Sequence, residues 1–368
     1  MMLIEADGKA LFAASGIAVP PGIEAATADP PPLPGPGPWM VKAQLPAGGR
    51  GKAGLIRRCA DASAVRAALR DLLGATHRGH PVRSCLIENL AAGAEHYLAV
   101  MLDPASHGLR LLYRPSGGVE VEAAGTLAGT LCAPDEAALD AAIARTIPHP
   151  AIAATARTLG RLLLDQELML AEINPLFVTE RAAVAGDAKV VIDLNALPRQ
   201  PGLAALLTAR PAAYPDAIRK FESGFDYVEI DPNGSIGLLT TGAGLSMMLI
   251  DELTARGARP LNFCDIRTSM LRGSPERIIA ALGWMAARPS LRVVLVNIFA
   301  GITDLGEFAG LLADALAASP GLRVPVVARL IGRGAEEAGR VLAERAPGVT
   351  LETELDAALA QVAALEAA

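Results

Sequence analysis

The chain has 368 residues, of which 52% are hydrophobic, and its formal net charge is −6 with a pI near 5.5. This length exceeds one typical core, so we expect two or three domains. The acidic balance and the 4% aromatic content argue against a nucleic-acid surface, which needs a basic stripe and stacking rings. No stretch approaches the roughly eighteen uninterrupted apolar residues of a membrane span, and the N-terminus lacks the regions of a signal peptide.

The four cysteines argue against a zinc site and against a disulfide framework, because they are widely scattered and form no CxxC pair. These features together predict a soluble, cytoplasmic protein that acts on small molecules. The cysteines are Cys59, Cys85, Cys132 and Cys264.

The first half of the chain has the pattern of an α+β arrangement. An amphipathic helix is expected at 3–15, followed by a proline-rich connection. Strands are expected at 39–44, 85–88, 96–102, 109–113, 119–122, 168–173 and 189–193, and helices at 61–73, 137–145 and 151–164.

The second half alternates strand and helix from about residue 226, which is typical of a doubly wound parallel sheet. We therefore predict two domains, 1–225 and 226–368. The five expected strands are 236–239, 260–264, 292–298, 324–330 and 349–351, each followed by a helix.

A glycine-rich segment follows the first long strand. Lys42 lies on that strand, and Gly48-Gly49-Arg50-Gly51-Lys52 comes directly after it. A loop with few Cβ atoms lets backbone N–H groups approach phosphate oxygens, and the basic side chains add positive charge. The segment lacks the spacing of a Walker A loop. A flexible hairpin tip with solvated charges is the alternative interpretation.

A candidate metal site lies in Glu172-Ile173-Asn174-Pro175 and the strand that ends at Asp193. Glu172 and Asn174 point to one face of an extended chain, and we expect Pro175 to end the ladder. Folding the hairpin near Ala183 would bring Asp193 beside them, whereas Asp187 would not reach. These oxygen ligands suit Mg²⁺. A pair of solvated acidic residues is the alternative.

Weaker signals lie at strand ends and in two loops of the second half. Glu88 and Glu95 flank strands, where their carboxylates could accept hydrogen bonds from a nucleotide. Loops 240–244 and 299–304 follow the first and third parallel strands, where open sheets bind ligands. Exposed glutamates and tight βα turns are the ordinary alternatives.

Taken in order, these residues resemble the β subunit of succinyl-CoA synthetase, within the ATP-grasp acyl-CoA ligase superfamily. The resemblance covers nearly the whole chain. It rests on Lys9-Ala10-Leu11-Phe12, Gly16 to Pro20, Val41 to Gln44, Ala47 to Gly54, Gly117-Gly118-Val119-Glu120, Glu172 to Leu176, Asp193, Asn195-Ala196-Leu197, Arg199-Gln200, Gly242 to Leu245, Asn262-Phe263, Val296 to Phe299 and Val324 to Val327.

The resemblance implies an ATP-grasp domain followed by a flavodoxin-like CoA-ligase domain. It implies phosphate transfer from ATP or GTP to a histidine, then to an acid whose acyl phosphate is displaced by CoA. That histidine and the CoA site are expected on a partner α subunit, so this chain carries no catalytic residue of its own. The implied nucleotide ligands are Lys42, Gly49, Arg50, Gly51, Glu88 and Glu95, and the implied Mg²⁺ ligands are Asn174, Asp193 and Glu172.

Departures from the family pattern concentrate in the loops expected to contact the acid. Thr241 replaces an Asn, and Asp265 to Ser269 stands where a run of glycines normally follows Asp-Val, so side chains are added there. We expect Arg267 either to bind an extra or displaced carboxylate or to form a structural salt bridge. A regulatory subunit with a degenerate acyl site, and an ATP-grasp ligase with another acceptor, are the alternative functions. The residues implied to contact the acid are Thr241, Gly301, Ile302, Thr303 and Arg267.

Overall fold

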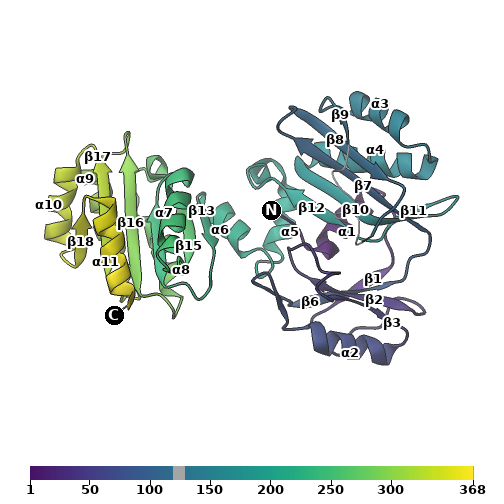
Figure 1. The fold of residues 1–368 in the computed structure, drawn as a ribbon, viewed down its shortest axis with the longest axis horizontal. Helices are drawn as coiled ribbons and strands as arrows, with labels where there is room; N and C mark the ends of the chain where they lie inside the picture. The colour runs from purple at the N-terminus through teal and green to yellow at the C-terminus, as the bar shows by residue number, and fades with distance from the viewer. Residues whose placement is uncertain (119–128, 368) are drawn as a thin grey trace. The chain divides into compact units, whose positions relative to one another are not determined.

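The computed structural model describes residues 1–118 and 129–367, which divide into two compact units, Met1–Ala213 and Tyr214–Ala368 (Figure 1). This division falls ahead of helix α6 (Pro215–Ser223), which packs against strand β13 of the second unit, whereas the sequence placed the boundary at 225/226. The strand expected at 119–122 and the second half of the Gly117–Glu120 motif lie outside the described residues.

The first unit contains a small antiparallel sheet in the order β1-β6-β2-β3. An apolar core lies between this sheet and helix α2 (Ala62–Leu72). The Asp61 carboxylate caps the first turn of α2 by accepting a hydrogen bond from Ala64 N–H. The hairpin β4 (Thr76–His77) and β5 (His80–Pro81) precedes β6. The strands are β1 (Gly22–Ala25), β2 (Trp39–Gln44), β3 (Ile56–Cys59) and β6 (Ser84–Asn89).

A second antiparallel sheet of the same unit has the order β11-β10-β7-β8-β9, with β12 also paired to β10. Helices α3 (Glu136–Thr146) and α4 (Pro150–Asp165) pack on it, and the N-terminal helix α1 (Glu5–Ala14) contacts β12. The strands are β7 (Ala94–Asp103), β8 (Gly108–Arg114), β9 (Thr130–Cys132), β10 (Leu168–Val178), β11 (Ala183–Ala185) and β12 (Lys189–Ile192).

Strand β10 does not end at Pro175, as we expected, but continues to Val178 with a shift of register between Ile173 and Leu176. The chain turns at 179–182, where Thr179 N–H donates to Ala182 O. The pairs Glu172–Lys189 and Leu176–Ala185 therefore bracket Asn174 and Asp187, which lie opposite each other.

The prediction that the hairpin brings Asp193 beside Glu172 and Asn174 is wrong. Ile192 pairs with Leu168, so Asp193 lies at the opposite end of β10 from Asn174, roughly 20 Å away at about 3.3 Å per residue. Its carboxylate accepts from Asn195 instead. The physical reason is the turn: its centre lies two residues earlier than expected, which moves each cross-strand partner by four (193 − 189 = 4).

The segment between the sheets and the second unit is short and helical. The 3₁₀ turn η1 (Leu197–Arg199) and helix α5 (Pro201–Thr208) follow β12, and α6 opens the second unit. Gly224, with φ of +72°, ends α6 in the left-handed conformation that favours glycine.

The second unit is a sheet in the order β13-β15-β14-β16-β17-β18, of which β13 (Asp226–Glu229) is antiparallel and the rest are parallel. The five parallel strands confirm the predicted βα pattern, and their order is that of a flavodoxin-like sheet. The antiparallel edge strand β13 was not predicted. The parallel strands are β14 (Ile236–Thr240), β15 (Asn262–Asp265), β16 (Val293–Ala300), β17 (Val326–Gly332) and β18 (Val349–Glu352).

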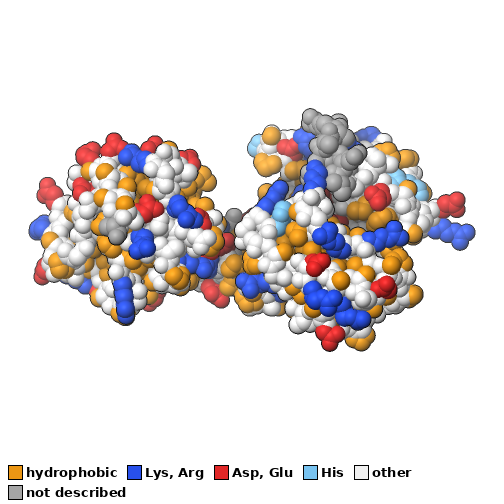
Figure 2. All heavy atoms as spheres, turned by 60° about the horizontal axis from the view of Figure 1, so that its bottom comes forward, with side chains coloured by type: hydrophobic (Ala, Val, Ile, Leu, Met, Phe, Trp, Pro, Cys, Tyr) orange, Lys and Arg blue, Asp and Glu red, His pale blue; other side chains and the backbone are white. Residues whose placement is uncertain are grey.

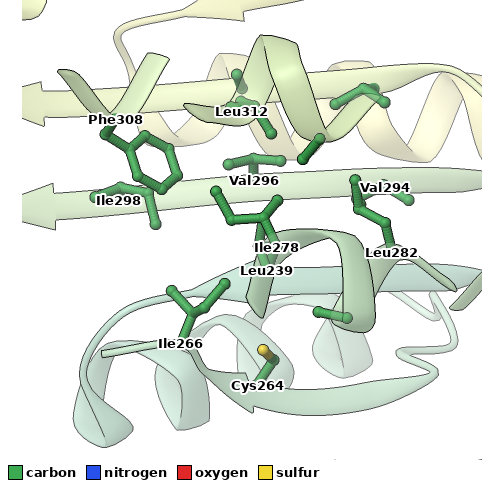
Figure 3. Packing of buried hydrophobic residues seen from close by; sticks show 14 of the residues in the cluster. Leu239, Cys264, Ile266, Ile278, Leu282, Val294, Val296, Ile298, Phe308 and Leu312 are labelled. Carbon is green, nitrogen blue, oxygen red and sulfur yellow. The ribbon is translucent and has the colours of Figure 1, made fainter. Parts of the chain in front are cut away.

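Both faces of this sheet are covered, which explains its nearly continuous apolar strands. On β16, Val294, Val296 and Ile298 face α8 (Glu276–Ala286) and α9 (Leu305–Ala317), as Figure 3 shows. Val293 and Leu295 point to the other face, against α7 (Ala243–Ala255) and α11 (Leu355–Ala367). Helix α10 (Ala335–Arg345) packs beside α9.

The β14–β15 pairing depends on a buried side chain. Asn262 is fully buried; its Oδ1 accepts from Leu238 N–H at 3.0 Å and its Nδ2 donates to Leu238 O at 2.8 Å. Main-chain bonds join the strands only on either side of it, such as Ile266 N–H to Thr240 O. The Asn262 amide thus replaces a main-chain pair in the centre of the sheet.

The surface of both units is mixed in character. Figure 2 shows positive, negative and hydrophobic side chains interspersed on the visible face of each unit. Within residues 1–118 and 129–367, none of the helices has the length and apolar character needed to cross a membrane.

Replacing Asn262 by Ala should destabilise the second unit. Each buried backbone group that loses its partner costs about 1–3 kcal/mol, so the free energy of unfolding should fall by roughly 2–4 kcal/mol. Urea denaturation and amide exchange at Leu238 measure this. Asn233→Ala, at an exposed position of the same unit, is the control. Unchanged protection of the Leu238 amide in Asn262→Ala would contradict the role given to Asn262.

Candidate functional site

A cavity of about 550 Å³ lies in the first unit, bordered by both of its sheets and by α1. This volume is within the usual range for small-molecule sites. The six residues predicted to bind nucleotide, Lys42, Gly49, Arg50, Gly51, Glu88 and Glu95, all line it. Glu172 and Asn174 line it from β10, whereas Asp193 is absent from its described lining.

Lys42 sits on β2 with its ammonium buried among acceptors of the same chain. Its Nζ lies 2.8 Å from Glu5 Oε1 and 2.6 Å from Glu88 Oε1, and it donates to Gly186 O at 2.6 Å. These three partners match the three N–H donors of an ammonium. Burial lowers the pKa of Lys42, but the carboxylates of Glu5, Glu88 and Asp187 outweigh burial and raise it, so the side chain stays charged.

Glu5 forms ion pairs with all three cations of this cluster. It comes from the first turn of α1, is almost completely buried, and lies 2.8 Å from Lys42, 2.9 Å from Lys9 and 2.8 Å from Arg50. Burial raises the pKa of a carboxyl, yet the charges of Lys42, Lys9 and Arg50 more than offset burial and hold the pKa of Glu5 well below its ordinary value.

Helix α1 reaches the cavity because it packs closely on the segment before β12. A Cβ added at Gly8 would lie 3.1 Å from the Ala188 Cβ, so the glycine permits this approach. Lys9, one turn after Glu5, then forms an ion pair with Glu88 and donates to Gly186 O at 3.0 Å. Glu5, the first residue of α1, thereby becomes part of the cavity wall.

Arg50, in the glycine-rich loop, is also fully engaged. Its Nη1 donates to Ala43 O at 3.1 Å and pairs with Glu5, and its Nη2 donates to both carboxylate oxygens of Asp187 at 3.0 and 3.1 Å. Burial lowers the pKa of Arg50, but Asp187 and Glu5 outweigh burial and raise it. Asp187, which we expected not to reach the site, is therefore in it.

Sequence reasoning missed three charged members of this cluster, Glu5, Lys9 and Asp187. Glu88, which was predicted to bind nucleotide, is 2% exposed, and its two oxygens bind Lys9 and Lys42. The available signal was the charged pair Glu5 and Lys9, four residues apart on a short helix that also carries Asp7. A helix that buries charged side chains needs partners for them.

The donors suited to a metal lie on the β10 side of the cavity. Glu172 and Asn174 share a face of β10, and Asp187 lies opposite Asn174. At present Asn174 Oδ1 accepts from Gly118 N–H at 2.7 Å, and Glu172 accepts from Tyr97 and Lys189. Among the described residues, no group of three or more His, Cys, Asp or Glu side chains is placed to hold a metal by itself.

Two carboxylates and one amide oxygen nevertheless suit Mg²⁺, which usually takes one or two protein carboxylates and shares its other positions with waters and phosphates. The cavity also offers apolar side chains, which could sandwich a flat base next to this polar wall. They are Met40, Ile56, Leu90 and Phe177.

The residues predicted to contact an acid lie in the second unit, in loops at the carboxyl ends of parallel strands. Thr268 Oγ1 lies 2.8 Å from Thr303 Oγ1 and 3.5 Å from Thr241 Oγ1, so hydroxyls from three loops meet. Gly301 and Ile302 lie beside Thr303, with Ile302 almost fully exposed. Asp265 accepts from Gly242 N–H at 2.9 Å and so caps α7.

Arg267 has a left-handed backbone with φ of +52° and pairs with Asp226 at 2.7 Å. The Asp226 carboxylate also binds Lys220. This geometry is that of the structural salt bridge, and it leaves the carboxylate-binding role of Arg267 a prediction. Nearby Arg277 has a buried Nη1 without a hydrogen-bond partner among the described residues.

Comparison with known proteins agrees with this two-part organisation. Residues 2–128 match the model of the ATP-grasp domain, and residues 239–363 match that of the CoA-ligase domain. The succinate–CoA ligase [ADP-forming] subunit beta of Rubrobacter xylanophilus is 38% identical over 97% of either chain, and that of Thioalkalivibrio sulfidiphilus is 33% identical over the full length of both.

The chain belongs to the family of succinate–CoA ligase β subunits. The predicted order of domains, ATP-grasp followed by CoA ligase, is confirmed, and so is the assignment to a ligase family. A solved ATP citrate lyase from Methanothrix soehngenii, in complex with citrate and coenzyme A, has the same fold. It is 18% identical, with a TM-score of 0.65 over 86% of this chain and 83% of that one.

Glu5 should be essential to the stability of this ligase subunit. In Glu5→Gln, Lys9, Lys42 and Arg50 lose a shared buried counter-ion, and breaking a buried ion pair costs about 3–5 kcal/mol. Asp7→Asn is the matched control, because Asp7 is a buried, ion-paired carboxylate on the same helix that does not line the cavity. Urea denaturation of both variants measures the difference; equal losses would contradict a special role for Glu5.

The same carboxylate should appear in the pH dependence of stability. The pKa of Glu5 is lowered in the folded state, so its contribution is complete above the unfolded value of about 4.3 and is lost as the pH falls through the folded pKa. The free energy of unfolding of the native chain should therefore decrease below about pH 4.3 more steeply than that of Glu5→Gln. Parallel slopes for the two proteins would rule out this contribution.

Proposed function

We propose that the first unit binds ATP or GTP with Mg²⁺ in the cavity and supplies the phosphate that activates a small organic acid for transfer to CoA. The observation that carries this proposal is the cavity itself, where Lys42, Arg50 and the glycine-rich loop face Glu172, Asn174 and Asp187. Positive charge and backbone N–H groups on one wall suit a polyphosphate, and oxygen donors on the other suit its metal ion.

The geometry favours Asp187 over Asp193 as the carboxylate partner of Asn174. Asp187 lies opposite Asn174 and lines the cavity, whereas Asp193 lies at the far end of β10. When bound, Mg²⁺ would neutralise phosphate charge and orient the terminal phosphate. The chain's own part is to hold the oxygens: Lys42 and Arg50 bind phosphate, and Glu88 and Glu5 keep those two cations in place.

The reaction requires a second protein. The chain has five histidines, His77, His80, His96, His107 and His149, and its sequence has none after residue 149. The loops that we propose to contact the acid thus have no histidine of their own to carry phosphate. We propose that a partner α subunit supplies the phosphohistidine and the CoA site, which agrees with the name "subunit beta" of the relatives.

The acid is proposed to bind at the carboxyl ends of β14, β15 and β16. Thr241, Thr268 and Thr303 present hydroxyls there, and Gly301 and Ile302 complete the loop after β16. These hydroxyls, together with the Asp265 carboxylate at the end of β15, make this edge of the sheet polar. They favour a hydroxylated or otherwise polar dicarboxylate over an unsubstituted one.

Arg50→Gln should lower nucleotide-dependent turnover by a factor of about 10²–10³. Co-purify the chain with its candidate α subunit and screen acids for CoA-dependent release of ADP. Loss of a preorganised donor to a reacting phosphate costs about 10²–10³ in rate. Arg66→Gln, an exposed arginine on α2, is the control and should keep native activity.

Two results of that screen would redirect the proposal. Acyl-CoA formation by the isolated chain would refute the need for an α subunit. Labelled γ-phosphate that enters the partner without acid-dependent turnover would favour a regulatory subunit.

The face that receives the α subunit is proposed to surround the carboxyl ends of the same strands. Phe299 ends β16 with 61% of its surface exposed, and Met247 on the first turns of α7 is 59% exposed. Met270, in the turn η2 (Thr268–Met270) after β15, is also exposed. Large apolar side chains that gather at one edge of a sheet mark a protein interface.

Phe299→Asp should weaken co-purification of the α subunit by at least about tenfold in Kd, because it places a charge in an apolar interface. Leu351→Asp, an exposed leucine on the edge strand β18 of the same unit, is the control. Association can be measured by analytical ultracentrifugation. Equal retention of the partner by both variants would place the interface elsewhere.

A further inference from the structure

The charged cluster around Lys42 and Arg50 carries no net charge in this structure. Three cations, Lys9, Lys42 and Arg50, face three carboxylates, Glu5, Glu88 and Asp187. Every donor of the Lys42 ammonium has a partner in the chain, and both terminal nitrogens of Arg50 do as well. A phosphate that binds the Lys42 ammonium or a terminal nitrogen of Arg50 therefore takes the place of a partner that this nitrogen already has.

The three carboxylates are not equally able to leave. The Glu5 and Glu88 side chains are 0% and 3% exposed, and each touches at least two cations. Moving either carboxylate would leave buried cations without a counter-ion, which costs a large amount of free energy. The Asp187 side chain is 25% exposed and pairs with Arg50 alone among the three cations by direct contact. Asp187 is therefore the carboxylate that can be exchanged.

The surroundings of Asp187 allow its side chain to move while its backbone stays. The adjacent Gly186 carbonyl is held by both Lys9 and Lys42, and Gly186 N–H donates to Pro175 O. Besides Arg50, the carboxylate of Asp187 is held by the Ala188 N–H, which donates to Oδ1 at 2.7 Å. Because Asn174 on β10 lies opposite Asp187, we expect a change of side-chain rotamer to direct the carboxylate from Arg50 toward Asn174.

We propose that Asp187 makes the site selective for metal-bound nucleotide. Without a metal ion, its carboxylate occupies the guanidinium of Arg50 at the position a phosphate needs and repels the phosphate's negative charge. With a metal ion, the same carboxylate moves to the cation and leaves Arg50 to the phosphate. This inference rests on the proposed function, and it assigns one residue the discrimination between free and metal-bound nucleotide.

The test is the affinity for nucleotide with and without metal, measured by calorimetry on the full chain and on Asp187→Asn. In excess EDTA, Asp187→Asn should bind ATP at least about tenfold more tightly than the native chain, equivalent to about 1.4 kcal/mol. With Mg²⁺ in excess the order should reverse. The ratio of the dissociation constant for ATP without metal to that with Mg²⁺ should be large in the native chain and should approach one in the variant.

Asp103→Asn is the matched control, because Asp103 also pairs with an arginine in the first unit, Arg110, but lies outside the cavity lining. Asp187→Ala is a second variant that removes the carboxylate without leaving an amide, and it should bind metal-free ATP more tightly too. Thermal unfolding confirms that each variant is folded.

The outcomes separate this inference from the proposed function. If the native chain binds Mg-ATP but neither Asp187 variant gains affinity for metal-free ATP, the exchange is refuted and the nucleotide site stands. If the native chain binds ATP under neither condition, both the nucleotide site and the exchange are refuted.

Discussion

The first unit depends on the burial of the Glu5 carboxylate among three cations. The free energy of burying an isolated carboxylate is strongly unfavourable, and so is that of burying an isolated ammonium or guanidinium. Helix α1, strand β2 and the glycine-rich loop can each place a charge in the cavity only because the others do the same. The N-terminal helix is thus tied to the proposed phosphate site by electrostatics as well as by packing.

This arrangement explains how one wall of the cavity can be both rigid and ready for a ligand. Glu5 and Glu88 form ion pairs with Lys42 and Lys9, and both lysines donate hydrogen bonds to the Gly186 carbonyl. The result is a preorganised set of cations whose positions do not depend on the ligand. Of the three carboxylates in this cluster, Asp187 is the one with a partly exposed side chain, on the side from which a charged ligand would arrive.

The second unit solves a different problem by more regular means. Its parallel strands are apolar on both faces, and helices α7, α8, α9 and α11 bury them. The site that we propose for the acid therefore lies in the loops at the strand ends. Where a polar group does enter the sheet, at Asn262, it is fully hydrogen-bonded to Leu238. The loops after β14 and β15 carry Thr241 and the segment Arg267 to Ser269, in which this chain departs from the family pattern, so the departures lie outside the sheet itself.

The sequence by itself determined the order of elements, the two-part organisation and the wall of the cavity that carries Lys42, Arg50 and the glycines. These are local properties, since hydrophobic periodicity and glycine-rich turns are set by neighbours in the chain. Only the tertiary structure decided which carboxylates join them. Lys42 meets Glu5 across 37 residues and Gly186 across 144, and the hairpin register that places Asp187 rather than Asp193 beside Asn174 depends on a turn shifted by two residues. Such partners are selected by the requirement that buried charges balance, and no local pattern expresses that requirement.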